Sequence, residues 1–248
     1  MFAFERHWAR MERDAELMHV PFPAEPAEIE DPLRKLIEAN RATDAALRVI
    51  VVRNRGGLWE GPGIDREFDL IAFTSDVKRW GEGVSLDLVA DARHAGSIFS
   101  GTKVLSWSQN LVYLERAQRR GFDEVILLNE HGNVSECTSA NVFVAEGDRI
   151  WTPPLSAGCL PGITRQVLLG EIRAEGISIG EKDLRPRDLE RADEVFITST
   201  TRGVLPVHAV NGLNIHRQSS SRKPVQRAFG EYVRAYVENA KSAKQRQT

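Results

Sequence analysis

The spacing of apolar residues predicts helices and strands in the first part of the chain. Residues 4–17 have the spacing of an amphipathic helix. A Pro-rich connection follows, and Asp31-Pro32 predicts the start of a second helix that ends near Ala39. Runs of β-branched and apolar residues then predict three strands, over residues 45–54, 68–75 and 84–90. This part of the chain is therefore predicted to be α+β.

The remainder of the chain mixes the same two patterns. Residues 94–102 lack periodicity and are rich in small side chains, which predicts a linker between domains. Helices are predicted over three segments, at 105–121, from Gly162 to about Ala174, and at the end of the chain to about Ala240. Short strands are predicted at 123–129, 133–137, 140–145, 193–200 and 203–210. The whole chain is thus predicted to be a mixed α/β (α+β) protein.

Composition narrows the class of protein without changing this picture. Of the 248 residues, 42% are hydrophobic and 27% are charged, which is ordinary for a globular protein. A net charge of −2 gives no field that favours nucleic acid or a membrane surface. Cys137 and Cys159 form no disulfide framework, so free thiols and a cytoplasmic location are expected.

Lys103 is the sharpest candidate for chemistry. It stands between the predicted linker and the helical pattern, among small and apolar neighbours. A lysine forms a Schiff base with an aldehyde only after losing its proton, and burial promotes that loss. On this residue alone, a solvated lysine at a helix N-terminus is the alternative.

Three further groups would complete a site for an aldehyde cofactor with a phosphate. Glu136 lies on a predicted strand, where a carboxylate can pair with a protonated pyridine nitrogen. Residues 162–165 open a helix, and the free N–H groups of a first helical turn bind phosphate. The hydroxyl-rich residues 198–201 and the guanidinium of Arg10 could add donors. Taken singly, each has a plainer alternative. Glu136 and Arg10 could be solvent-facing side chains, residues 162–165 an ordinary helix start, and residues 198–201 a polar turn.

Other kinds of site are not indicated. The six histidines show no metal-ligand spacing, so no metal is expected. The chain has no G-x-G-x-x-G, P-loop or G-x-S-x-G motif.

The order of these features resembles that of the class IV (fold-type IV) pyridoxal-phosphate enzymes. This family includes branched-chain aminotransferases, D-amino-acid aminotransferases and aminodeoxychorismate lyases. The resemblance covers nearly the whole chain and rests on three motifs: K-x-x-x-x-x-x-N-x-x-x-x-x-x-A with G-x-D-E, then G-N-V-S-E-C-T-S-A-N-V-F, then T-P-P with L-P-G-I-T-R.

The resemblance implies a role for each candidate residue. Lys103 matches the Schiff-base lysine, and Glu136 matches the partner of the pyridine nitrogen. Leu160 matches a side chain against the cofactor ring, and Trp107 stands near the place of a tyrosine that bonds the ring hydroxyl. The residues that match phosphate ligands are Arg10, Gly162, Ile163, Thr164, Ser199 and Thr200.

The resemblance also implies the organisation and the activity. It predicts a small N-terminal domain over residues 1–95 that lacks its first strands, a linker over 96–102, and a large, β-barrel-like cofactor domain with helices over 103–248. A homodimer that uses pyridoxal 5'-phosphate is expected. The predicted reaction moves an amino group between an amino acid, with a branched-chain-like L-amino acid favoured, and a 2-oxo acid.

Two alternatives stay open at this point. One is an aminodeoxychorismate lyase that releases 4-aminobenzoate and pyruvate, and the other is an N-terminally truncated, inactive homologue that binds the cofactor. The truncated reading arises because the chain has no Y-G-x-G-V-F-E-type strand before Phe2. The absence of R-x-H after Arg53 and in the region 85–100 disfavours a D-amino-acid aminotransferase.

Overall fold

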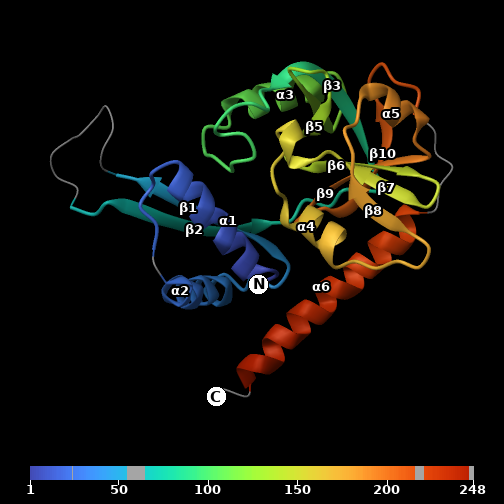
Figure 1. Cartoon of the computed structure of the whole chain (residues 1–248). Coiled ribbons are helices and arrows are strands. Elements are labelled where there is room, and N and C mark those ends of the chain that lie inside the picture. The colour runs from blue at the N-terminus through green and yellow to red at the C-terminus, as the bar shows by residue number, and fades with distance from the viewer. Residues whose placement is uncertain (24, 55–64, 216–220, 246–248) are drawn as a thin grey trace. The chain divides into compact units, whose positions relative to one another are not determined.

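The chain folds into two compact units, each described here by itself (Figure 1). The structure is a computed structural model that describes residues 1–23, 25–54, 65–215 and 221–245, with side chains as far as residue 240. The small unit spans Ala3–Arg79, and the large unit comprises Met1–Phe2 with Trp80–Thr248. The division falls before the predicted boundary at residue 95, because the strand in between pairs with strands of the large unit.

The small unit combines two helices with a hairpin. Helix α1 confirms the helix predicted at residues 4–17, and β1 and β2 confirm the first two predicted strands. The two strands pair antiparallel from Ala45 opposite Asp76 to Arg53 opposite Phe68. The elements of this unit are α1 (Phe4–Leu17), α2 (Pro26–Ala39), β1 (Ala45–Arg53) and β2 (Phe68–Asp76).

The start of α2 was predicted wrongly. The helix begins at Pro26 and contains Pro32, whereas Asp31-Pro32 was expected to open it. Pro26 at the first helical position lacks an N–H that would have no acceptor there in any case. Pro32 removes one hydrogen bond inside the helix, but its neighbour Leu33 is only 2% exposed, and this burial helps to stabilise the helix through the interruption.

The large unit is built on a curled eight-stranded mixed sheet (Figure 1). The strand order is β5-β4-β3-β10-β9-β6-β7-β8, with parallel pairing for β10/β3, β3/β4 and β7/β8. Two of the strands, β7 and β8, were not predicted. The strands are β3 (Val84–Arg93), β4 (Glu124–Asn129), β5 (Val134–Cys137), β6 (Asn141–Glu146), β7 (Arg149–Thr152), β8 (Ser178–Glu181), β9 (Glu194–Ser199) and β10 (Gly203–Val210).

Helices cover this sheet. They are α3 (Ser108–Arg119), α4 (Ile163–Gly170), α5 (Pro186–Arg191) and α6 (Arg222–Gln245), with a short 3₁₀ turn at Leu155–Ala157. Helix α4 ends earlier than the predicted Ala174, because Ala174 forms a β-bridge with Ile177 that turns the chain back. Within the described ranges, no helix is long and apolar enough to cross a membrane.

The sheet buries apolar side chains on both faces, as β9 shows. Val195 and Ile197 point into one core with Leu184 and Leu189, close to α5. Phe196, between them, points into a second core made with side chains of α4 and α6. Since successive residues of a strand face opposite sides, a continuous apolar run fits a strand that is covered twice. The sheet of the large unit therefore has an apolar core on each of its two faces.

Candidate active site

The segment before Lys103 is fixed to the large unit by its backbone. The carboxylate of Glu130 accepts the N–H groups of Ala95 at 2.8 Å and Gly96 at 3.2 Å. These bonds lower the pKa of Glu130 to about 2. Gly101 has a φ of +72°, and a Cβ at this position would lie 3.1 Å from the carbonyl oxygen of Cys159. The chain thus reaches Lys103 along the turn that carries Leu160.

Lys103 itself is exposed in the structure, in contrast to the burial considered from its small and apolar neighbours. Its charge is close enough to Glu136 to lower the pKa of that carboxyl group, as the weakest of several influences. Lysine and glutamate therefore belong to one region of the large unit.

Glu136 is held on both of its carboxylate oxygens. Its side chain is 13% exposed, and burial raises the pKa of its carboxyl group. Arg93 opposes this effect by donating from Nε to Oε1 at 3.1 Å, and the backbone N–H of Leu160 donates to Oε2 at 3.0 Å. The structure thus brings together Glu136 and Leu160, two of the predicted site residues.

Arg93 and Asn110 join the site through contacts that were not predicted from the sequence. Arg93 donates from Nη1 to Oδ1 of Asn110 at 3.0 Å, and Asn110 donates from Nδ2 to the carbonyl oxygen of Thr138 at 2.8 Å. Asn110 is only 6% exposed although it lies on α3. The helix that follows Lys103 is thereby tied to the segment that follows Glu136.

The N-terminus of α4 offers free donors beside this carboxylate. The helix begins at Ile163 after Gly162, and no side chain caps its first N–H groups. Thr164 is 1% exposed, and its Oγ1 is buried without a hydrogen-bond partner among the described residues. A buried hydroxyl left without a partner is costly, and a ligand with acceptor oxygens at this helix end would suit it.

Asn141 shapes this turn and was not singled out from the sequence. Its Nδ2 donates to the carbonyl oxygen of Leu160 at 2.9 Å. A Cβ on residue 162 would lie 2.1 Å from Oδ1 of Asn141, so only glycine fits at Gly162. A side chain from β6 thus fixes the first part of the L-P-G-I-T-R turn.

The turn after β9 lies next to Asn141. In the ladder between β6 and β9, Asn141 is opposite Thr198, and the turn with Ser199 and Thr200 follows at once. Thr200 is exposed, and Ser199 Oγ accepts the backbone N–H of Arg202 at 3.2 Å. Both predicted phosphate-binding segments therefore flank one residue, Asn141.

Two predicted site residues are not joined to the others by any contact described here. Arg10 lies on α1 in the small unit, where it is half-buried and 3.4 Å from Nδ1 of His7. Burial lowers the pKa of its guanidinium group. Trp107 precedes α3 and is half-buried, and its backbone N–H donates to the carbonyl oxygen of Leu105 at 2.7 Å. The roles of Arg10 and Trp107 stay predictions.

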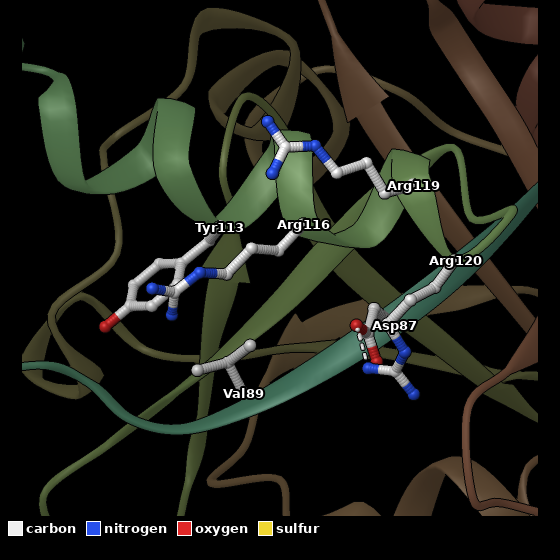
Figure 2. Close-up of a pocket in the computed structure, with 6 residues that line it drawn as sticks. All are labelled: Asp87, Val89, Tyr113, Arg116, Arg119 and Arg120. Carbon is white, nitrogen blue, oxygen red and sulfur yellow. Dashed lines mark hydrogen bonds and ion pairs between the residues drawn. The ribbon is translucent and has the colours of Figure 1, made fainter.

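A surface depression of about 320 Å³ lies over β3 and α3 (Figure 2). Arg116 lies beside the ring of Tyr113 there, and Arg120 pairs with Asp87 at 2.7 Å. None of the predicted cofactor residues lines this depression. We therefore place the candidate site at Lys103, Glu136 and the α4 N-terminus.

Comparison with known proteins decides the family. A sequence model described as amino-transferase class IV matches residues 1–210. The chain belongs to the class IV aminotransferases. This membership confirms the predicted family and the prediction that the protein is a pyridoxal-phosphate-dependent transaminase.

Relatives within the family carry more than one activity in their names. A D-alanine aminotransferase of Bacillus licheniformis is 31% identical over 219 residues, covering 87% of this chain and 76% of the relative. The branched-chain-amino-acid aminotransferase of Escherichia coli K12 is 25% identical over 248 residues, covering 92% and 77%.

Solved structures agree with the predicted fold. A crystal structure of the Escherichia coli branched-chain amino acid aminotransferase superposes with a TM-score of 0.83 at 26% identity, covering 94% of this chain and 80% of that one. A putative 4-amino-4-deoxychorismate lyase of Legionella pneumophila has the same TM-score at 21% identity, covering 95% and 86%, which shows a common fold alone. The prediction of a fold-type IV architecture is confirmed.

Proposed function

We propose that this class IV aminotransferase exchanges the amino group of a branched-chain-like L-amino acid with a 2-oxo acid, and that it uses pyridoxal 5'-phosphate. The observation that carries the site assignment is the pair of hydrogen bonds on Glu136, from Arg93 and from the N–H of Leu160. These bonds orient a largely buried carboxylate beside the segment that carries Lys103 and beside the turn that opens α4.

The residues present fit this cofactor. Glu136 would face the ring nitrogen and Leu160 the ring, with Lys103 at the aldehyde and Trp107 at the ring hydroxyl. The phosphate would take the N–H groups of a helix that no side chain caps, and acceptor oxygens at this helix end would suit the buried hydroxyl of Thr164. The proposed phosphate ligands are Arg10, Gly162, Ile163, Thr164, Ser199 and Thr200.

The side chains divide the work of the reaction. When bound, the cofactor supplies an aldehyde that takes up the amino group and a ring that accepts the electron pair left at the substrate α-carbon. Lys103 would first hold the cofactor and then, once released, act as the general base that takes the proton from the substrate α-carbon and delivers it to the former aldehyde carbon. Glu136 keeps a negative charge opposite the ring nitrogen, while the phosphate ligands hold the reacting atoms in line.

Several relatives support the choice of substrate. Proteins named branched-chain-amino-acid aminotransferases, from Escherichia coli and Pseudomonas aeruginosa among others, match this chain at 25–27% identity. The 31% identical D-alanine aminotransferase is the strongest counter-indication. Against it stands the absence of an R-x-H motif after Arg53 and in the region 85–100.

A panel of amino donors tests this choice. Purified protein loaded with cofactor is given L-leucine, L-valine, L-isoleucine or D-alanine with 2-oxoglutarate, and glutamate is measured by chiral chromatography. We expect L-glutamate from the branched-chain donors. Faster turnover of D-alanine would overturn the stereochemistry, and pyruvate released from aminodeoxychorismate without an acceptor would indicate a lyase. Bound cofactor with no turnover of any donor would indicate an inactive homologue.

Replacing Gly162 by alanine should weaken cofactor binding. The new Cβ would lie 2.1 Å from Asn141 Oδ1, so the turn must shift away from β6 and break the bond to Leu160. The loss of one such hydrogen bond at the phosphate site corresponds to about tenfold in the cofactor Kd. Gly170→Ala is the matched control, since nothing lies within 4 Å of its Cβ at the end of the same helix. An unchanged Kd for Gly162→Ala, measured by fluorescence titration of the cofactor-free protein, would contradict this role.

The assembly and the compartment are part of the proposal. Exposed apolar side chains flank Lys103, with Ile98 at 74%, Phe99 at 51% and Leu105 at 62% exposure. Such residues are costly to leave in water, which supports a homodimer that covers them. Cys137 and Cys159 are buried free thiols, as is usual in the reducing cytoplasm.

A further inference from the structure

Arg202 makes three side-chain hydrogen bonds near the proposed phosphate site. It lies in the turn between β9 and β10, and its side chain is only 9% exposed. Its Nη1 donates to the carbonyl oxygen of Ser139 at 2.9 Å, and its Nη2 donates to Ser139 Oγ at 2.9 Å and to Glu124 Oε2 at 3.1 Å. The ring of Trp80 covers the guanidinium at 4.4 Å.

Glu124, the ionic partner of Arg202, organises the segment behind Glu136. This carboxylate on β4 is fully buried and accepts the hydroxyl of Ser139 at 2.6 Å and that of Thr138. Both hydroxyl residues follow directly after β5, the strand that carries Glu136. Glu124 and Arg202 therefore clamp this bend from two sides.

The clamp joins two cofactor segments that are far apart in the sequence. On one side is the bend at Thr138 and Ser139, and on the other is the turn that contains Thr200. Inside this turn, the backbone N–H of Arg202 donates to Ser199 Oγ at 3.2 Å. The ladder of β9 and β10 closes this turn at Ser199 and Gly203, and the side chain of Arg202 ties its tip, next to exposed Thr200, to the bend at Ser139.

We propose that Arg202 is a positioning residue for the cofactor: it fixes the turn of Ser199 and Thr200 so that the turn's donors meet the phosphate. This inference rests on the proposed function, because it takes Thr200 as a phosphate ligand. Arg202 acts through the turn and does not touch the reacting atoms.

The chemistry of the site requires arginine. A planar guanidinium can reach Ser139 and Glu124 at once and still stack on an indole ring, whereas an ammonium group is a single point of charge. A buried ion pair adds little net stability compared with well-packed apolar residues, so stability alone gives no strong reason for this pair. The need for a fixed geometry between two ligand-binding segments is a stronger reason for this ion pair.

The test compares cofactors with and without the phosphate. Cofactor-free wild-type, Arg202→Met and Arg202→Lys proteins are titrated with pyridoxal phosphate and with pyridoxal, and the unfolding midpoint of each is recorded. We expect the Kd for pyridoxal phosphate to rise about tenfold in Arg202→Met, the loss of one charge-assisted bond, and the Kd for pyridoxal to stay unchanged. Arg202→Lys keeps a counter-charge for Glu124. If the methionine variant does not fold, the same two dissociation constants are compared in the lysine variant.

Arg222→Met is the matched control. Arg222 is also a nearly buried arginine, and it pairs with Glu194 at the opposite end of β9. This variant should lower the unfolding midpoint while leaving the ratio of the two dissociation constants unchanged. A purely structural role of Arg202 would give the same pattern in both arginine variants, and that result would overturn the proposal.

A double-mutant cycle with Thr200→Val tests whether Arg202 acts through the turn. If Arg202 acts through the turn, Arg202→Met should weaken phosphate binding much less once Thr200 is changed. Additive effects would overturn the proposal. Failure of the proposed function gives a different result, since wild-type protein would then bind pyridoxal phosphate no better than pyridoxal.

Discussion

Replacing Lys103 by alanine should lower turnover by about 10²–10⁴-fold, the range expected when a general base is removed. The same change removes the amine that would hold the cofactor, so the visible absorbance of bound cofactor should also change. Two consequences are therefore expected from a single substitution, one on rate and one on the spectrum. Both are measured on purified protein, by steady-state transamination and by an absorbance scan after dialysis.

Lys182→Ala is a suitable control for this experiment. Lys182 is a partly exposed lysine of the large unit, and it pairs with Glu146 at 3.4 Å instead of with a predicted site residue. Its removal should leave rate and spectrum as in wild type. If Lys103→Ala retained wild-type turnover, the assignment of the whole site would fail.

Glu136→Gln should bind the cofactor but turn over about 10²-fold or more slowly. An amide carries no charge to hold the proton on the ring nitrogen, and removing one preorganised electrostatic group commonly costs this much. The Gln oxygen can still accept the N–H of Leu160, so the turn should keep its shape. Glu146→Gln, on the pair with Lys182, is the control carboxylate.

The pH dependence of cofactor binding provides a second readout for Glu136. Burial raises the pKa of its carboxyl group, so in the cofactor-free protein it takes up a proton at a higher pH than an exposed glutamate does. As the pH falls through this raised pKa, the wild-type protein loses the charge that faces the ring, and its cofactor affinity should fall. Glu136→Gln should lack this step. A wild-type rate, or the same acid step in the variant, would show that another group does this work.

The elements that the sequence predicted well are those with a long, regular apolar pattern. Helix α1 and strands β4, β6 and β9 have such patterns and lie where they were expected. The strands β7 and β8 have four residues each, too few to show a period, and they form only because the neighbouring sheet edge is there to pair with. Helix α2 begins at Pro26 and runs through Pro32, because tertiary burial outweighed the local start signal at Asp31-Pro32.

The residues of the candidate site also fall into those that could be predicted from local patterns and those that could not. Lys103, Glu136 and the turn from Leu160 could be picked out because they lie in short motifs with local meaning. The pairing of Arg93 with Glu136 and the contacts of Arg202 could not be predicted, since the partners lie 43 residues away in one case and 63 and 78 residues away in the other. Such pairs depend on strand order, which a single sequence does not display. The side chains that hold the ligands in place could therefore not be identified from the sequence.

The most direct test of the account is to locate the cofactor on the chain. Purified protein is incubated with pyridoxal phosphate, reduced with borohydride, digested and analysed by mass spectrometry, with Lys103→Ala treated in parallel. We predict the reduced cofactor on Lys103 alone in wild-type protein and on no residue in the variant. Stoichiometric attachment to another lysine, or none in wild type, would contradict the account.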